Sequence, residues 1–255
     1  MWTGSYVYLL TNLVQKDFKV RYRNMSLGIF WSLLNPLVTT LVLTFVFTQI
    51  KAFANGRPHF PVFLLCGLVP FNFFVMAWSS STSSLVDNEK IIKRIPVPRE
   101  VVPIATVLGN CVHLLIQIGL LLGFALAFGL GISRHWFWLP VLWSLEVIFV
   151  CGLALITAAV NVYVRDTRYV VESINAILFW LVPIFYPIEL VPEQYAELYQ
   201  YNPVAALVVA LRSILLDGHA PHLPIIWKLA GSSLFMLAAG LLAFRKLKAG
   251  FYDYL

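Results

Sequence analysis

The chain has 255 residues, of which 60% are hydrophobic and 12% charged, and its formal net charge is +6. A mean hydropathy of +0.82 is too apolar for a soluble core and indicates a polytopic membrane protein. The positive charge is also compatible with nucleic-acid binding, but the cations gather at the ends of apolar runs, where membrane topology and anionic lipid explain them.

The first predicted element is an amphipathic helix from Tyr6 to Arg23. At 100° per residue its polar side chains fall on one narrow face and its apolar side chains on the other. A helix on the inner membrane surface and an ordinary cytosolic helix both fit this pattern. Asp17 and Arg21 interrupt the apolar arc at i,i+4 spacing, so we expect them to pair and the last turns to pack on protein.

Six apolar segments are predicted membrane spans, although prolines 183 and 187 break the fifth, and together they predict a single all-α membrane domain. They cover residues 29–50, 60–84, 101–132, 136–162, 173–188 and 225–244. Asn35-Pro36 should kink the first span, either as part of a gate or as a structural bend. The second span ends in the hydroxylated run 79–84, which favours close packing but can also line a wet pathway.

Two polar features lie inside later spans. His113 and Gln117 share a helix face in the third span, where a buried interhelical hydrogen bond is expected. Glu146 is the one carboxylate deep in a predicted span, and such a group is a functional candidate by default. A proton relay and a pairing with a neighbouring helix both remain open for Glu146.

The segment 85–100, LVDNEKIIKRIPVPRE, holds seven charged side chains between two apolar runs, so it is predicted to be a water-exposed turn. A short helix can run to about Ile95, because Pro96 and Pro98 end it. This rigid basic segment suits docking to a soluble partner. Residues 163–172 form a second charged loop in this interpretation.

The segment 189–224 is predicted to lie on the opposite side of the membrane. Asn202 can cap a helix that has Pro203 at its first position. The apolar run that follows is too short to span, which predicts a re-entrant or interfacial hairpin. Of the 18 Lys and Arg residues, 13 fall on the side of the loop 85–100 and five on the other. The positive-inside rule therefore places both termini, including the tail 245–255, in the cytosol.

The sequence carries no GxxxxGK[ST], HExxH or GxSxG motif, so it shows no means of hydrolysing a nucleotide. His113 and Glu146 do not form the catalytic cluster at one membrane face that an embedded enzyme would need. The three cysteines lack metal or disulfide spacing and are interpreted as packing residues. We therefore expect no catalytic residue and no metal site in this chain.

Five segments carry a resemblance to a known family. They are KDFKVRYRNMSLGIFWSLLNPL (Lys16 to Leu37), IIKRIPVPREVVPIA (Ile91 to Ala105), NVYVRDTRYVV (Asn161 to Val171), PIFYP (Pro183 to Pro187) and YNPVAALVVALRSIL (Tyr201 to Leu215). In this order they resemble the ABC-2 type permeases that export O-antigen, capsule or teichoic acid, and the O-antigen type fits best.

The resemblance implies a homodimer in the bacterial inner membrane, with two copies of a separate ATPase subunit that bind ATP and Mg. The substrate would be a lipid-linked polysaccharide, moved through a channel at the dimer interface. An ABC-2 permease for a small lipid or drug, a membrane-embedded glycan-modifying enzyme and a proton-coupled carrier are the alternatives.

The resemblance also implies three sets of site residues. The coupling helix that contacts the ATPase would comprise Asn88, Glu89, Lys90, Ile91, Ile92, Lys93, Arg94 and Ile95. The interfacial gate helix would carry Lys16, Asp17, Lys19, Arg21 and Arg23. Channel-lining aromatic residues would be Phe30, Trp31, Phe71, Phe73, Phe74, Phe179, Trp180, Phe185 and Tyr186, because sugar C–H faces pack on aromatic rings. The segment between Val191 and Pro224 would form re-entrant outer helices.

Overall fold

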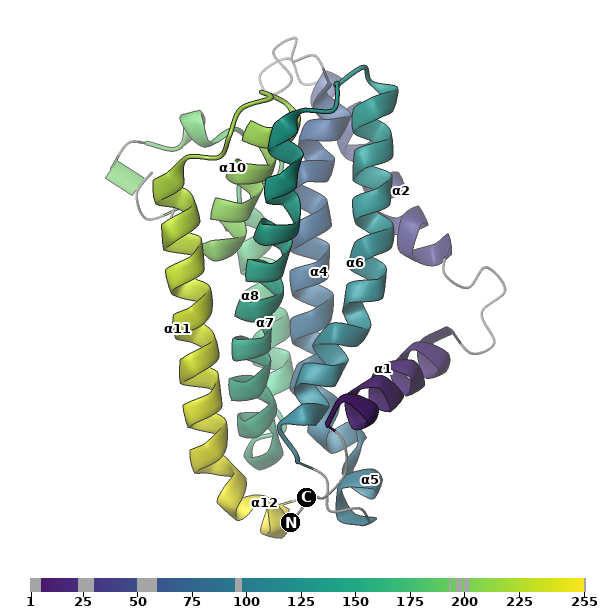
Figure 1. The fold of residues 1–255 in the computed structure, drawn as a ribbon, viewed down its shortest axis with the longest axis vertical. Helices are drawn as coiled ribbons and strands as arrows, with labels where there is room; N and C mark the ends of the chain where they lie inside the picture. Colours follow the sequence, from purple (N-terminus) through teal and green to yellow (C-terminus); the bar gives the residue numbers. More distant parts are fainter. Residues whose placement is uncertain are drawn as a thin grey trace.

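The computed structural model describes residues 6–22, 30–49, 59–94, 98–192, 194–195, 199 and 202–254. Regular structure within these residues is helical, as predicted (Figure 1). The α-helices are α1 (Tyr6–Tyr22), α2 (Trp31–Gln49), α4 (Phe60–Asp87), α5 (Glu89–Arg94), α6 (Val101–Ala127), α7 (Trp138–Tyr163), α8 (Thr167–Leu181), α10 (Pro203–Leu215), α11 (Leu223–Leu247) and α12 (Phe251–Tyr254). Short 3-10 turns are η2 (Arg134–Phe137), η3 (Ile188–Leu190) and η4 (Lys248–Gly250).

Four helices in the described part of the chain, α4, α6, α7 and α11, are long and apolar enough to cross a membrane. They run lengthwise beside one another in Figure 1, with α1 lying obliquely across one end. We call the end with α5 and α12 the α5 end, and the end where α4 begins the α10 end. Helices α2 and α8 have 19 and 15 residues, so the six-span count stays a prediction.

Several helix boundaries differ from the sequence interpretation. Helix α4 continues to Asp87, and α6 ends at Ala127 before the glycines that follow it. Helix α8 begins at Thr167, so most of the predicted charged loop 163–172 is helical. Arg168 and Glu172 are four residues apart on that helix and both are exposed, so their charges do not require a loop.

Helix α4 lies at the centre of the main hydrophobic core, and its hydroxylated run contacts three neighbouring helices. Thr82 Oγ1 is 2.8 Å from Thr157 Oγ1 of α7, Asn110 Nδ2 of α6 donates to Ser80 Oγ at 3.0 Å, and Asn175 Nδ2 of α8 donates to Ser79 Oγ at 3.0 Å. These bonds confirm the packing interpretation of the run 79–84.

Helices α7 and α11 cross with their backbones in close approach. A Cβ added to Gly240 would lie 2.4 Å from the carbonyl oxygen of Gly152, and one added to Gly152 would lie 2.4 Å from the carbonyl carbon of Met236. Only glycine fits at both positions, because real Cβ atoms do not approach backbone atoms so closely. The two glycines therefore allow α7 and α11 to pack backbone against backbone.

Helix α10 is fixed to the bundle by a buried arginine. Asn202 caps its first turn by accepting from the backbone N–H of Val204 at 3.1 Å, as the sequence predicted. The Arg212 guanidinium lies 3.5 Å from the centre of the Phe63 ring and donates to the carbonyls of Ile184 at 2.7 Å, Tyr186 at 3.3 Å and Phe63 at 3.4 Å. Prolines 183 and 187 prevent regular helix there, so Arg212 supplies the donors that these carbonyls need. Arg212 is one of the five cations that charge counting places on the outer side, and its side chain is buried.

Candidate functional site

A second apolar cluster at the α5 end brings together helices that are distant in the sequence. Leu13 of α1, Leu85 of α4, Ile92 of α5 and Phe244 of α11 belong to it and are 9% exposed or less. Phe251 of α12 is fully buried in the same cluster. The N-terminal helix, the turn 85–100 and the C-terminal tail therefore share one packing unit.

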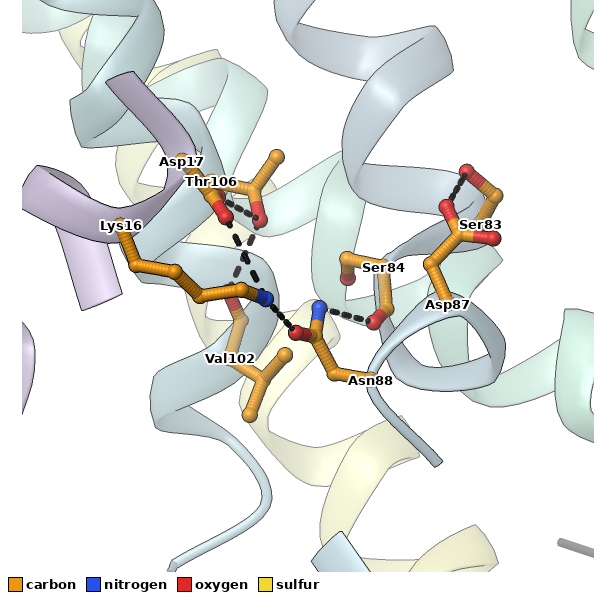
Figure 2. A network of polar contacts seen from close by, with 8 residues as sticks. All are labelled: Lys16, Asp17, Ser83, Ser84, Asp87, Asn88, Val102 and Thr106. Atoms are coloured by element: carbon orange, nitrogen blue, oxygen red, sulfur yellow. Dashed lines mark hydrogen bonds and ion pairs between the residues drawn. The ribbon is translucent and has the colours of Figure 1, made fainter. Parts of the chain in front are cut away.

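Four polar residues next to this cluster, Lys16, Asp17, Asn88 and Thr106, contact one another. We call them the α1–α5 junction. Figure 2 shows Lys16 reaching from α1 towards Asn88, where α4 ends. Lys16 Nζ donates to Asn88 Oδ1, and it also lies 3.9 Å from Asp17 Oδ1. Thr106 Oγ1 of α6 donates to Asp17 Oδ2 at 3.1 Å.

Asn88 joins three helices through separate atoms. Its backbone N–H and its side-chain Nδ2 both donate to the carbonyl of Ser84, at 3.2 and 2.8 Å, and so cap α4. Its carbonyl accepts from the N–H groups of Ile91 and Ile92 at 2.9 and 3.0 Å, which begins α5. Its Oδ1 holds Lys16 of α1, and the whole side chain is 7% exposed. Asn88 therefore links the end of α4, the start of α5 and the side chain of Lys16 on α1.

Asp17 packs α1 against α6 rather than against lipid, as expected for the last turns of this helix. In addition to the bond from Thr106, a Cβ built on Gly109 of α6 would lie at an ordinary contact distance of 3.8 Å from Asp17 Cβ. Lys19 is exposed. The predicted partner of Asp17, the side chain of Arg21, lies outside the described part of the chain, as does Arg23.

Helix α5 covers most of the predicted segment 88–95 and presents different chemistry on its two sides. Ile92 is 7% exposed in the apolar cluster, whereas Lys90 and Lys93 are exposed. Lys93 Nζ donates to Glu89 Oε1 at 2.6 Å, one helical turn earlier. This hydrogen bond holds the pKa of the Glu89 carboxyl below its usual value. The Arg94 side chain and Ile95 lie outside the described part of the chain.

The C-terminal segment supports the far side of the turn. Arg99 Nη1 donates to the carbonyl of Lys248 at 3.4 Å, and the Lys248 ammonium lies 3.9 Å from Glu100 Oε1. Tyr163 OH of α7 donates to the carbonyl of Leu247 at 2.5 Å. Sequence reasoning missed these contacts, and also Thr106, because a lone Thr on an apolar helix and a short basic tail carry no specific pattern.

The nine predicted channel aromatics fall into different environments. Phe71, Phe73 and Phe74 are 4% exposed or less and pack in the main core of this chain. These three rings pack inside this single chain, and their assignment to a channel surface stays a prediction. Trp180 and Phe30 are 66% and 65% exposed.

The remaining predicted aromatics cluster around the break after α8. Phe179 and Phe185 have ring centres 6.0 Å apart, and Phe185 and Tyr186 have ring centres 5.4 Å apart. Phe185 is buried, whereas Phe179 and Tyr186 are partly exposed. Trp180 packs edge-on against Phe185 at 5.4 Å. The side chain of Trp31 lies outside the described part of the chain.

His113, Gln117 and Glu146 are buried in α6 and α7. The Glu146 carboxyl accepts no hydrogen bond from the described residues. Within the same residues no group of three His, Cys, Asp or Glu side chains is placed to hold a metal ion.

Comparison with known proteins supports a transport role for this arrangement. The chain matches the ABC-2 type transporter family over residues 8–216. It is 31% identical over 248 residues to an O-antigen export system permease protein, RfbA, of Klebsiella pneumoniae, covering 97% of this chain and 95% of the relative. The corresponding protein of Myxococcus xanthus is 28% identical over 237 residues, 92% and 90% of the two chains. The polysialic acid transport protein KpsM of Escherichia coli is 26% identical over 234 residues, 91% of each.

Proposed function

This chain belongs to the ABC-2 type transporter family, and we propose that it is the permease subunit of an ATP-driven exporter of an O-antigen-like polysaccharide. The observation that carries the proposal is the similarity over almost the full length to permeases for O-antigen and to a polysialic acid transport protein. The multi-pass helical structure agrees with a membrane subunit.

In this proposal the α5 end faces the cytosol and α5 is the surface that receives the ATPase. Positive-inside counting supports the orientation, and the exposed Lys90 and Lys93 offer contacts to an acidic cleft. Ile92 anchors α5 to the cluster that also contains α1, α6 and α11. Asn88 then passes a displacement of α5 to Lys16, so that ATP binding on the partner repositions the interfacial helix α1.

The homodimer, its channel and the lipid-linked substrate belong to the same proposal. Helices α2 and α8 carry exposed apolar residues, among them Leu41 at 70%, Phe45 at 65% and Ile177 at 59%. Such surfaces suit a second copy of the chain or the lipid of the bacterial inner membrane. Phe30 and Trp180 are the exposed aromatics from which a sugar-sliding surface would be built, with Phe179 and Tyr186 beside them.

The test uses two variants of α5, one that reverses the charge at position 93 and one that exchanges Glu89 and Lys93. Lys93→Glu alone removes the bond to Glu89 and places two acids one turn apart, which weakens the helix itself. The exchange Glu89→Lys with Lys93→Glu restores an ion pair within α5 but changes the pattern that faces the partner.

We expect both variants to lose ATP-dependent export or co-purification of the ATPase subunit, measured with the permease in nanodiscs. Arg134→Glu, an exposed charge reversal in the turn η2 at the α10 end, is the matched control. If the exchange variant keeps both ATP-dependent export and the bound ATPase subunit, α5 is not the surface that receives the ATPase.

A further inference from the structure

A large cavity opens at the α10 end of the molecule, away from the α1–α5 junction. Its volume is about 630 Å³, within the range typical of small-ligand sites. The walls come from the start of α4, the turn η3, helix α10 and the start of α11. Its polar lining residues are His59, Glu189, Tyr199, Arg212, Ser213, Asp217 and His222.

The floor of this cavity is built around Arg212. Arg212 is fixed there because its guanidinium already donates to the carbonyls of three residues and stacks on Phe63, which also lines the cavity. An arginine that already donates to backbone carbonyls in this way is poorly placed to bind a phosphate group with two parallel hydrogen bonds. It instead forms part of the polar surface of the cavity. Val209 and Ile225 add apolar walls.

The rim offers several hydrogen-bonding groups of mixed type. Glu189 and Asp217 are exposed carboxylates that accept bonds from hydroxyl groups, while His222 and Tyr199 can both donate and accept. Two carboxylates at one opening repel an anionic ligand. Polar groups at the rim together with apolar walls match the two kinds of surface on a neutral sugar, its hydroxyl edge and its C–H face.

His59 adds an unusual backbone to this rim. Its φ of +68° and ψ of 28° place it in the left-handed region, which non-glycine residues rarely adopt. Its carbonyl accepts from the N–H groups of Val62 and Phe63 at 2.9 and 3.1 Å and so begins α4. Strained residues of this kind gather at ligand sites. The ring of His59 also packs edge-on against Phe128 at 6.1 Å.

We propose that this cavity, the α10-end pocket, binds a short run of neutral sugar units of the exported polysaccharide as the chain leaves the transporter. The inference rests on the proposed function, which supplies the polysaccharide and places the α10 end on the outer side of the membrane. Bound sugar would resist backsliding between transport cycles, because leaving the pocket breaks its hydrogen bonds to the rim residues.

Photo-crosslinking in cells that make and export their own glycan tests this proposal. A benzophenone amino acid replaces Val209, which lines the pocket, or Trp227 of α11, which is 75% exposed and lies outside the lining. After irradiation, adducts that carry glycan are detected with an antibody or lectin specific for that polysaccharide.

The expected result is a glycan adduct at Val209 that needs an active ATPase, with little adduct at Trp227. Equal adducts at the two positions, or none at Val209 while export continues, would contradict sugar binding in the α10-end pocket. Either result would leave the proposed function intact. Absence of ATP-dependent export by the unmodified complex would instead overturn the function.

Carboxylate variants identify the chemistry of the ligand. Asp217→Ala combined with Glu189→Ala removes both carboxylate acceptors, so the Val209 adduct should fall by roughly fivefold or more, which corresponds to about 1 kcal/mol of lost binding. Asp166→Asn, at the opposite end of the chain's fold, should leave the adduct unchanged. A larger adduct in the double variant would show that the pocket takes an anionic group, and would overturn the assignment to neutral sugar.

Discussion

The bond between Lys16 and Asn88 allows a quantitative test of how α1 and α5 are linked. Lys16→Met removes the ammonium group and keeps a long apolar stem, whereas Asn88→Ala removes the acceptor. The end of α4 stays capped in the second variant, because the backbone N–H of residue 88 still donates to the carbonyl of Ser84. Each single variant therefore removes the contact without deleting a helix.

The magnitude follows from the exposure of the two partners. A hydrogen bond from a charged group contributes about 1.5–3 kcal/mol when it is well buried. The Lys16 side chain is 39% exposed, so water replaces part of this interaction and roughly 0.5–1.5 kcal/mol remains. In a chain of this length, 1 kcal/mol corresponds to a change of about 2–4 °C in the unfolding midpoint.

A double-mutant cycle isolates this energy. Unfolding is measured for the permease in nanodiscs with Lys16→Met, Asn88→Ala and both together, and export per ATP hydrolysed is measured on the same samples. We expect a coupling energy of roughly 0.5–1.5 kcal/mol. Lower export per ATP should appear in either single variant, with little further loss in the double variant.

Lys19 supplies the control, because it is exposed on the same helix. Combining Lys19→Met with Asn88→Ala should give additive changes in the free energy of unfolding. If the changes for Lys16 and Asn88 are also additive within about 0.3 kcal/mol, the two residues are not energetically linked and the proposed transmission is wrong.

Three further predictions concern packing and charge. Gly240→Leu should lower the free energy of unfolding by about 1–3 kcal/mol or more through overpacking, and the unfolding midpoint should fall with it. Gly231→Leu should change the midpoint little, because the space around its Cβ position is open. Arg212→Lys should also lower the midpoint, because one ammonium cannot serve three carbonyls in the guanidinium geometry, and an unchanged midpoint would contradict the role given to this arginine. The pKa of Glu89 is depressed in the folded protein, so its pairing with Lys93 stabilises the fold at pH values above the ordinary glutamate pKa. This stabilisation is lost as the pH falls through the lower pKa of the folded state. Carboxyl NMR titration should show the Glu89 pKa rising in Lys93→Gln, and identical titrations would refute the pairing.

Much of the helical framework is predictable from apolar periodicity and helix-ending residues. Pro203 after Asn202 located the start of α10, and the prolines after Ile95 limited the length of α5. Charge was a poorer guide, because exposed Arg168 and Glu172 suggested a loop where the chain forms the first turns of α8. A charged side chain on a helix surface and one in a loop have the same local sequence signal.

The candidate site was predictable only in part. The basic turn 85–100 identified α5, but no local pattern indicated that Asn88 would hold Lys16, because 72 residues separate them. Aromatic content likewise could not separate the buried Phe74 from the exposed Trp180. Both outcomes depend on which helices become neighbours, and this information is not contained in the local sequence.

The hydrogen bonds of Arg212 have a consequence for biogenesis. The three carbonyls that accept its hydrogen bonds belong to Phe63, Ile184 and Tyr186, all of which precede α10 in the chain. In the proposed re-entrant arrangement, a cation on this short apolar helix has no compensating acceptors in the lipid until those segments are in place. The insertion of α10 is therefore expected to follow the docking of α4 with the segment after α8, which orders the last steps of membrane assembly.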